Sequence, residues 1–406
     1  MALALRVFLP FAFAYLLAYL MRVVNAVAGA PLTAEFGLSP ADLGLLTSVY
    51  FVGFAVMQIP FGVLMDRYGP RRVEALALLF AAAGCVLFAL AAASPHLLLG
   101  RFLMGLGASM SLMAPMTAYR SWFTPERRAL VIGLHMAFGG LGSAIAGGPA
   151  EALIDAVGWR GMFLVLSGGI VVAALTIALV VPRQREPQAA VRILALTREV
   201  ASVLRSPALW RVAPLSATVQ VGMLAVVGLW AGPWLREVAG MTDDVAAGWL
   251  SAAGIGLVAG FLFYGALFAR VERTGHATTA FVVGSLVTVA FPLVLIVVPP
   301  SYSGIVWILY AAVGSVGVHS YNIATSAFPA AMAGRVNTAL NFVVFVAAFL
   351  GQWGFGVVLA AYPGERGQAT YEGFQAAFLL LIAIQLVSAL PLLFRAGGRR
   401  ADARAH

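Results

Sequence analysis

The sequence predicts an all-α integral membrane protein with twelve transmembrane helices arranged as two six-helix bundles. Of its 406 residues, 62% are hydrophobic and only 10% are charged, whereas a soluble domain carries about 25% charged residues. The hydrophobic residues form twelve runs of membrane-spanning length, and one long polar stretch divides them into six and six. Lipid must therefore be the solvent for most of this surface, and helices are expected because they satisfy their own backbone donors.

Each hydrophobic run contains about 20 to 25 residues, and a helix needs roughly 20 to cross about 30 Å of hydrocarbon. The first run is too long for the core of a signal peptide, so we expect it to be retained as a span. The runs are found at residues 7–30, 42–64, 73–93, 97–119, 130–153, 160–181, 209–233, 246–269, 278–298, 304–326, 338–361 and 373–394.

The basic residues set the expected orientation. All 25 of them are arginines, and they lie in short connectors rather than in one patch that would bind nucleic acid. With the N-terminus inside, 20 arginines face the cytoplasm, four face the opposite side, and Arg22 is left inside a span. Because positive residues stay on the cytoplasmic side, we expect both termini to be cytoplasmic in a multi-pass protein of a bacterial inner membrane.

The polar stretch between the sixth and seventh runs predicts a cytoplasmic linker. Within it, Ile193, Leu196, Val200 and Leu204 recur at helical spacing among arginines, which indicates an amphipathic helix lying on the membrane surface. The expected organisation is an N-terminal bundle at 1–181, the linker at 182–208, a C-terminal bundle at 209–395 and a cytoplasmic tail at 396–406.

The two halves of the chain repeat each other weakly. The segment Gly62–Arg67 is similar to Gly265–Arg270 at an offset of 203 residues, which is half of the chain length. The acidic residue Asp66 has no counterpart in the second copy, where the position is Ala269. A duplicated six-helix unit with parallel halves around a midplane site is typical of one class of secondary transporters.

Two motifs resemble those of the major facilitator superfamily. The connector Gly62–Arg72 reads Gly-Val-Leu-Met-Asp-Arg-Tyr-Gly-Pro-Arg-Arg and is similar to that family's loop between the second and third helices. The segment Arg101–Gly107 reads Arg-Phe-Leu-Met-Gly-Leu-Gly and looks like its fourth-helix signature. The segment Gly139–Pro149 matches the glycine-rich fifth-helix motif of the family's antiporters only in part, since Ala144 replaces a glycine.

The resemblance implies a transporter that works by alternating access, with a gate near the cytoplasmic loop. In this family the aspartate at the position of Asp66 is thought to latch the two halves, and Gly334–Arg335 is its expected partner here. A solvated turn that only fixes the topology is the alternative. The gating residues that the resemblance implies are Gly62, Asp66, Arg67, Gly69, Arg71, Arg72, Arg101 and Arg335.

Arg22 is the most informative polar residue within a span. A buried arginine costs roughly 2.5–3.5 kcal/mol on insertion scales, so it usually faces a cavity or a partner. Tyr15, Tyr19 and Arg22 are spaced four and three residues apart and share a helix face, which Asn25 continues. Because the family's first helix lines a central cavity, we expect this face to receive an anionic or carboxylate-bearing substrate. The alternative is that Arg22 extends to the outer surface.

Polar residues in later spans are further candidates for substrate contact. Gln220 lies within the seventh run, and two pairs share helix faces in the tenth and eleventh runs. These pairs are His319 with Asn322 and Asn337 with Asn341. Buried amides also link helices by hydrogen bonds, so the alternative for each pair is a structural role.

Proton coupling has weaker candidates. No Asp or Glu lies at mid-membrane depth in the expected spans, which argues against a carrier for cations. His135 and His319 titrate in the physiological range and are candidate relays. A single membrane histidine is as often structural, and that remains the alternative for both.

The sequence lacks the motifs of enzymes and of ATP-driven pumps. It contains no His-Glu-x-x-His and no nucleotide loop of the Gly-x-x-x-x-Gly-Lys type, so we expect no catalytic residue, metal or cofactor. The single cysteine, Cys85, lies inside an apolar run and has no disulfide or metal partner at useful spacing.

We therefore expect a secondary active transporter of a small solute, working by symport or antiport, with a small organic anion as the favoured substrate. Its expected partners are the solute, the lipid bilayer and a coupling proton or counter-substrate, without nucleic acid, and a monomer is expected. The first alternative is proton-driven export of amphiphilic compounds, favoured by the partial fifth-helix motif and the aromatic spans. The second is a membrane sensor or receptor that binds a ligand without moving it.

Overall fold

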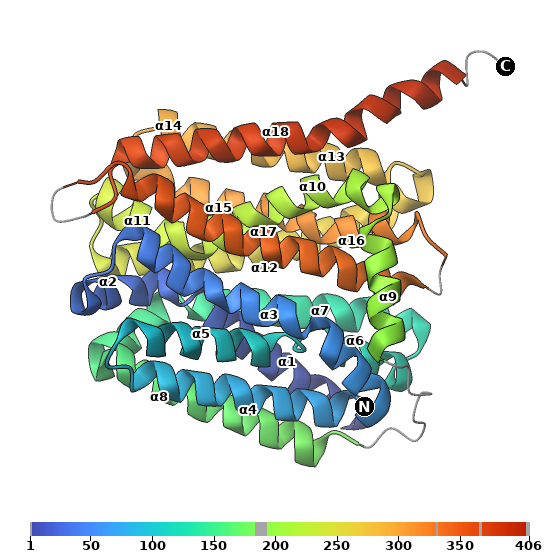
Figure 1. Ribbon diagram of the computed structural model, residues 1–406, viewed down its shortest axis with the longest axis horizontal. Coiled ribbons are helices and arrows are strands. Elements are labelled where there is room, and N and C mark those ends of the chain that lie inside the picture. Colours follow the sequence, from blue (N-terminus) through green and yellow to red (C-terminus); the bar gives the residue numbers. More distant parts are fainter. Residues whose placement is uncertain (1, 183–192, 330–331, 365–367, 403–406) are drawn as a thin grey trace.

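The computed structural model describes residues 2–182, 193–329, 332–364 and 368–402. Within these ranges the regular elements are helices, and the long ones run side by side between two ends of the molecule (Figure 1). Eleven described segments are long and apolar enough to cross a membrane, and Leu130–Ile145 is a shorter apolar helix. Together they account for the twelve expected spans and confirm the all-α membrane fold.

The first half of the chain forms one group of helices. Its helices are α1 (Ala2–Val23), α2 (Asn25–Phe36), α3 (Pro40–Tyr68), α4 (Pro70–Ala89), α5 (Ser94–Ala108), α6 (Met113–Trp122), α7 (Pro125–Ile145) and α8 (Gly148–Val180). The end of the fifth expected span and nearly all of the sixth fall within α8. A kink at Gly158 separates them, where φ is 73°, a conformation that residues with a side chain rarely adopt.

The second half forms the other group, and several of its spans are divided. Its α-helices are α10 (Pro207–Val221), α11 (Ala231–Pro233), α12 (Asp243–Val271), α13 (Ala277–Thr288), α14 (Ala290–Val297), α15 (Ser303–Gly314), α16 (Ser320–Thr325), α17 (Ala333–Ala360) and α18 (Tyr371–Asp402). Between them lie the π-helical segments η1 (Gly222–Trp230) and η2 (Trp234–Val238) and the 3₁₀ segments η3 (Glu272–Thr274), η4 (Pro300–Tyr302) and η5 (Ser315–His319). The helix α18 continues to Asp402, beyond residue 396 where a tail is expected to begin.

The local sequence explains where several long helices begin. Proline is the first residue of α3, α7 and α10, where its missing N–H costs nothing because that position has no intrahelical partner. At α3, Ser39 and Asp42 form a capping box, in which the Ser39 hydroxyl accepts from the Asp42 N–H at 3.2 Å. Proline therefore marks the start of all three helices, and a serine cap also marks the starts of α3 and α10.

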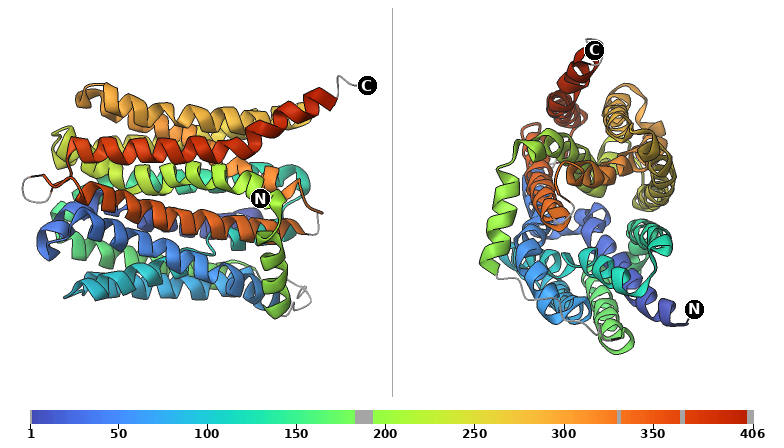
Figure 2. Two further views of the ribbon diagram at one scale, coloured as in Figure 1. Left: turned by 45° about the horizontal axis from the view of Figure 1, so that its top comes forward. Right: turned by 90° about the vertical axis from the view of Figure 1, so that its right-hand side faces the viewer.

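The two groups of helices form two bundles that meet along their length. Viewed along the helices, α1–α8 occupy one side and α10–α18 the other (Figure 2). The start of α1, the end of α18 and the short helix α9 (Ile193–Leu204) lie at the same end of the molecule, here called the α9 end (Figure 1). Helices α2 and α11 lie at the opposite end, the α2 end. The first and last described helices therefore have their outer ends on one side of the spanning region.

Helix α9 bridges the bundles at the α9 end. Val200 and Val203 on its apolar face are buried, and the helix contacts both α3 and α17. The Glu199 carboxylate pairs with Arg335 of α17 at 2.6 Å. The segment in which an amphipathic helix is expected is therefore docked against both halves of the protein.

Small residues allow the helices of the N-terminal bundle to approach closely. A Cβ atom on Gly105 would lie 1.8 Å from the Tyr50 carbonyl oxygen, and one on Gly142 would lie 2.1 Å from that of Leu16. The backbones of α3 and α5, and of α1 and α7, are thus in direct contact, as is common between membrane helices. Cys85 of α4 is buried in the same core as a free thiol.

Candidate functional site

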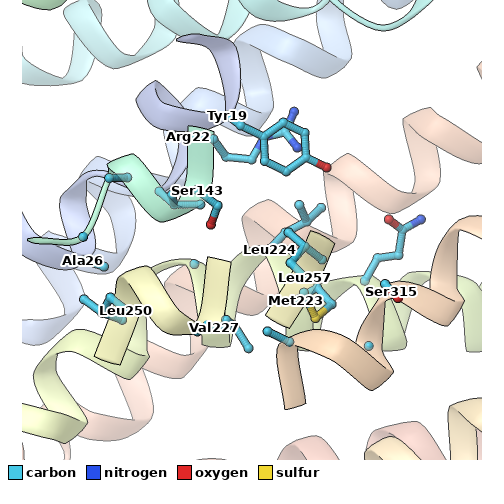
Figure 3. A pocket seen from close by; sticks show the side chains of 18 of the residues that line it. Tyr19, Arg22, Ala26, Ser143, Met223, Leu224, Val227, Leu250, Leu257 and Ser315 are labelled. Atoms are coloured by element: carbon cyan, nitrogen blue, oxygen red, sulfur yellow. The ribbon is translucent and has the colours of Figure 1, made fainter. Parts of the chain in front are cut away.

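A cavity lies between the two bundles. Tyr19, Arg22 and Ser143 line it from the N-terminal bundle, and Met223 and Leu257 face them from the C-terminal bundle (Figure 3). Met223 and Leu257 are near the midpoints of the seventh and eighth membrane segments. The cavity is therefore central, and both bundles contribute to its lining.

The backbone that borders the cavity is irregular in four membrane segments. The first segment breaks at Val24, and the fifth breaks at Ala146–Gly147. The seventh becomes π-helical at η1, and the tenth becomes 3₁₀-helical at η5. Irregular backbone within a membrane is tolerated where it lines a cavity, and discontinuous helices mark the binding sites of many transporters.

Arg22 provides the positive charge of the cavity. Its side chain is 7% exposed, and the guanidinium carbon lies 4.4 Å from the ring centre of Tyr19, 5.5 Å from that of Phe54 and 5.9 Å from that of Phe345. Phe345 comes from the C-terminal bundle, so rings of both halves surround this charge. In the described part of the chain, Arg22 forms no ion pair and its Nε atom makes no hydrogen bond.

A second buried arginine lies behind the first. The arginine count places Arg101 on the side opposite the cytoplasm, but the structure buries its side chain completely. Its guanidinium donates to the carbonyl oxygens of Met21 at 2.7 Å and Arg22 at 3.4 Å, which are left free by the break between α1 and α2. Arg101 therefore holds the backbone that carries Arg22 and adds positive charge next to the cavity.

Of the nine expected substrate-contact residues, three line the cavity. These are Tyr19, Arg22 and Gln220. Tyr15 lies behind Tyr19, with their ring centres 5.0 Å apart. Asn25 is fully buried and donates to Thr47 of α3 at 3.0 Å, which links two helices of the same bundle.

A short polar network extends from the cavity into the C-terminal bundle. Gln220 donates to the Tyr321 hydroxyl at 3.4 Å, and that hydroxyl donates in turn to the Asn341 side-chain oxygen. Asn341 thus supports a cavity residue without lining the cavity. Tyr321 was not expected from the sequence, because a tyrosine in an apolar run gives no signal of its partners.

The other three expected substrate-contact residues lie away from the cavity lining. His319 stacks on Phe268 with ring centres 3.8 Å apart. Asn322 is exposed and donates to Glu272 at 3.1 Å. Asn337 is partly buried, and its side-chain oxygen is unbonded among the described residues.

The residues of the expected gate lie around the α9 end, apart from Arg101. Arg67 is exposed and lies over the Tyr68 ring, and Arg72 is also exposed. Gly69 joins α3 to α4 with a φ of 77°. Arg71 donates from Nε to the Ala178 carbonyl at 3.0 Å. The structure does not describe the surroundings of Gly62 or the side chain of Asp66. The latch between Asp66 and Gly334–Arg335 therefore stays a prediction.

One wall of the cavity is apolar and was not expected as a site. It consists of Leu224, Val227, Leu250, Leu257 and Phe261. These residues resemble every other apolar residue of their spans in type, so only the fold can show that they face the cavity. The cavity therefore has one cationic, aromatic side and one hydrophobic side.

Polar contacts join the bundles between the cavity and the α2 end. The Ser251 hydroxyl of α12 donates to the Ala144 carbonyl at 2.7 Å and accepts from the Gly148 N–H at 2.8 Å. Arg236 donates to the Ala26 carbonyl at 2.9 Å. The partial glycine-rich motif of the fifth span thus forms a tight contact between the two halves.

Comparison with known proteins identifies the family to which this chain belongs. The model of the Major Facilitator Superfamily matches residues 11–352. The chain belongs to the major facilitator superfamily. It is accordingly a multi-pass integral membrane protein, as the topology and motifs predict.

Two curated relatives resemble part of this superfamily chain. A probable sulfoacetate transporter of Cupriavidus necator is 32% identical over 152 residues, which are 37% of this chain and 35% of the relative. A probable L-galactonate transporter of Escherichia coli is 29% identical over 154 residues, which are 38% of this chain and 34% of the relative. The matched segments thus span about a third of the length of each relative.

Solved structures share the fold of this protein over nearly its whole length. A D-xylose-proton symporter aligns with a TM-score of 0.74 and 15% identity, covering 94% of this chain and 97% of the other. At this identity the likeness establishes the arrangement of helices alone.

Proposed function

We propose that this protein is a secondary active transporter that carries a small organic anion by alternating access, with Arg22 as the residue that holds the anionic group. The observation that carries the proposal is the placement of Arg22. Its guanidinium lines a cavity between the bundles and forms no ion pair in the described part of the chain. A desolvated guanidinium attracts carboxylate, sulfonate and phosphate groups strongly, since its hydrogen bonds to them are charge-assisted.

The surroundings of Arg22 support an anionic substrate. Arg101 lies close by and is also without an ion pair among the described residues, so the two positive charges add. Gln220 and Ser143 offer hydrogen-bonding groups on the cavity wall, which suit the hydroxyl groups of a sugar acid. Two relatives are described as transporters of sulfoacetate and L-galactonate, both organic anions.

The hydrophobic wall supports a second candidate function. Leu250, Leu257 and Phe261 would accept the apolar part of an amphiphilic compound. Proton-driven export of such compounds is the alternative, and it does not require the charge of Arg22. The two functions therefore differ in their dependence on one residue.

We infer the orientation and organisation from the same physical argument. The arginine-rich connectors gather at the α9 end, and positive connectors stay in the cytoplasm, so the α9 end is proposed to be cytoplasmic in a bacterial inner membrane. The bundles at 1–181 and 209–395 are proposed to be the two units that rock about the cavity, with 182–208 as their linker.

A binding experiment on the purified full-length protein tests the anion proposal. Sulfoacetate and L-galactonate are compared with neutral and cationic amphiphiles for their effect on thermal unfolding. We expect at least one anion to raise the unfolding temperature, since a ligand that binds the folded state stabilises it. Arg22→Gln should weaken anion binding by about tenfold or more, because it removes a charge-assisted hydrogen bond.

The matched control is Arg270→Gln, which removes the same charge from an exposed position on α12. It should leave anion binding unchanged. Full anion binding by Arg22→Gln would contradict the proposal, and stabilisation by amphiphiles alone in both variants would favour the exporter. A receptor would bind an anion but show no counterflow in reconstituted vesicles.

A further inference from the structure

A buried carboxyl group lies in the N-terminal bundle, outside the cavity. Glu74 is on the first turns of α4, near the α9 end, and its side chain is 0% exposed. Neither of its oxygen atoms makes a hydrogen bond, and it forms no ion pair, among the described residues. An ionised carboxylate buried in this way is very costly, whereas the neutral acid is much less so.

The neighbouring polar groups come from the segments that pack against α4. Ser111, between α5 and α6, has a buried hydroxyl that is also unbonded in the described structure. The Tyr119 hydroxyl of α6 is close enough to Glu74 to interact with it electrostatically. Tyr119 is bonded to His135 of α7 at 3.1 Å. Glu74 thus faces the hydroxyl groups of Ser111 and Tyr119 and no described cation.

The described charges of the adjoining elements are engaged elsewhere. On α3, Arg67 is exposed and lies over Tyr68. On α5, Arg101 is bonded to the backbone at the start of α2. On α8, Arg160 pairs with Glu35 at 2.6 Å. On α4 itself, Arg71 donates to the Ala178 carbonyl and Arg72 is exposed.

The hydrogen bonds of His135 fix its tautomer. Its Nε2 atom lies 3.2 Å from the Ser111 carbonyl oxygen, which can only accept, so Nε2 carries the proton. The Nδ1 atom must then accept from the Tyr119 hydroxyl. Tyr119 keeps its lone pairs free, so a protonated Glu74 that turns toward this hydroxyl would donate to it and extend the bonded pair to a chain of three groups.

A series of ring contacts connects this cluster to the cavity. The His135 ring stacks on Tyr15 with ring centres 4.3 Å apart. Tyr15 contacts Tyr19 at 5.0 Å, and the Arg22 guanidinium lies 4.4 Å from the Tyr19 ring centre. A change in charge or position at Glu74, Tyr119 or His135 is therefore transmitted to Arg22 through side chains that are in contact.

We propose that Glu74, Tyr119 and His135 form a proton-binding site inside the N-terminal bundle, coupled to the Arg22 cavity through Tyr15 and Tyr19. Proton uptake converts the Glu74 carboxylate into a neutral carboxylic acid, and the proton comes from solvent at the α9 end. No other bond changes, so the net charge of the bundle rises by one. The coupling rests on the proposed anion transport, whereas proton binding does not.

Infrared difference spectroscopy of the purified full-length protein at varied pH tests proton binding without any substrate. We expect a C=O stretching band of a neutral carboxylic acid that titrates with pH and is lost in Glu74→Gln. Glu372→Gln, at an exposed position on α18, is the matched control and should keep the band. Tyr119→Phe should keep the band but shift its frequency, because it removes a polar group that interacts electrostatically with Glu74.

Identical spectra for the original protein and a folded Glu74→Gln would overturn the proposal. Size-exclusion chromatography and thermal unfolding establish that each variant is folded. An unshifted band in Tyr119→Phe would remove Tyr119 from the site and overturn the chain of three groups.

The coupling is tested by measuring sulfoacetate and L-galactonate affinity by calorimetry at several pH values. We expect affinity to depend on pH in the original protein and in Glu372→Gln, and to become independent of pH in Glu74→Gln. An unchanged pH dependence in Glu74→Gln would overturn the coupling. If neither anion binds at any pH, the anion proposal fails for these compounds, and the infrared result still decides whether Glu74 binds a proton.

Discussion

At the scale of single residues, the protein places charged groups in two different situations. Arg22, Arg101 and Glu74 are buried without an ion pair in the described part of the chain, whereas Glu35 and Arg160 form an exposed pair at the end of the bundle. Buried charges inside a membrane are costly and usually functional. The exposed pair contributes to local stability rather than to function.

The pair at Glu35 gives a prediction about pH. Hydrogen bonds from Arg160 and then from Trp159 hold the pKa of the Glu35 carboxyl below its ordinary value of 4.5. A lowered pKa in the folded state contributes stability above the unfolded pKa, and this stability is lost as the pH falls through the folded value. Glu35→Gln should therefore lower the unfolding temperature at neutral pH and flatten its decline in acid.

Thermal unfolding of the detergent-solubilised protein across this pH range measures the effect. Arg160→Gln should have a similar effect, and the double variant should lose less than the sum, because the two residues share one interaction. Additive losses would show that the pair does not stabilise the fold. The effect is expected to be small, since exposed ion pairs contribute little to stability.

At the scale of helices, close backbone contacts decide which glycines can be replaced. Gly105 of α5 faces the Tyr50 carbonyl, where a Cβ atom would lie at 1.8 Å. Gly105→Ala should force α3 and α5 apart and destabilise the protein by about 1–3 kcal/mol, the usual cost of overpacking. Thermal unfolding and the yield of monodisperse protein measure this effect.

The matched control is Gly168→Ala on α8, where nothing lies within 4 Å of the added carbon. It should be neutral or slightly stabilising, because alanine has the higher helix propensity. Equal stability of both variants would mean that the contact between α3 and α5 is looser than the structure shows.

The sequence predicts the helices better than their irregularities. Hydropathy and length fix the spans, because a span must be apolar over the whole thickness of the bilayer. The π-helical segment η1 was not predicted, since its hydrogen-bond pattern depends on tertiary packing, such as Gly222 against the Tyr310 hydroxyl. Composition carries no information about such contacts.

The candidate site was predicted in part for a related reason. Arg22, Tyr19 and Gln220 are polar residues in apolar spans, which is a signal in the sequence, and they line the cavity. Asn322 carries the same signal but is exposed near Glu272, because its depth depends on where the span ends in space. Glu74 lies close to the start of its span, yet neighbouring helices bury it completely.

At the scale of the whole molecule, the proposed alternating access requires the two bundles to separate where they now touch. The contacts of Ser251 with Ala144 and Gly148 join the bundles between the cavity and the α2 end. An alternate state that opens the cavity toward this end must break them, as rigid-body rotation about an interface does. At the other end, the short helix α9 contacts both bundles in this structure.

A cross-link between α8 and α12 tests this motion. A Cβ atom on Gly148 would lie 3.6 Å from the Ser251 hydroxyl oxygen, so the double variant Gly148→Cys with Ser251→Cys should form a disulfide. We expect oxidation to abolish transport of the anion in vesicles and reduction to restore it. Each single variant under oxidant is the control, and undiminished transport by the cross-linked protein would exclude separation at this contact.

The burial of the one native thiol makes this chain convenient for following such motion directly. Cys85 has no exposed surface, and burial in apolar surroundings keeps a thiol unreactive toward reagents in water. Maleimide dyes or spin probes will therefore attach only to sulfhydryl groups introduced elsewhere. Distances between reporters on the two halves can be recorded in the otherwise unaltered protein.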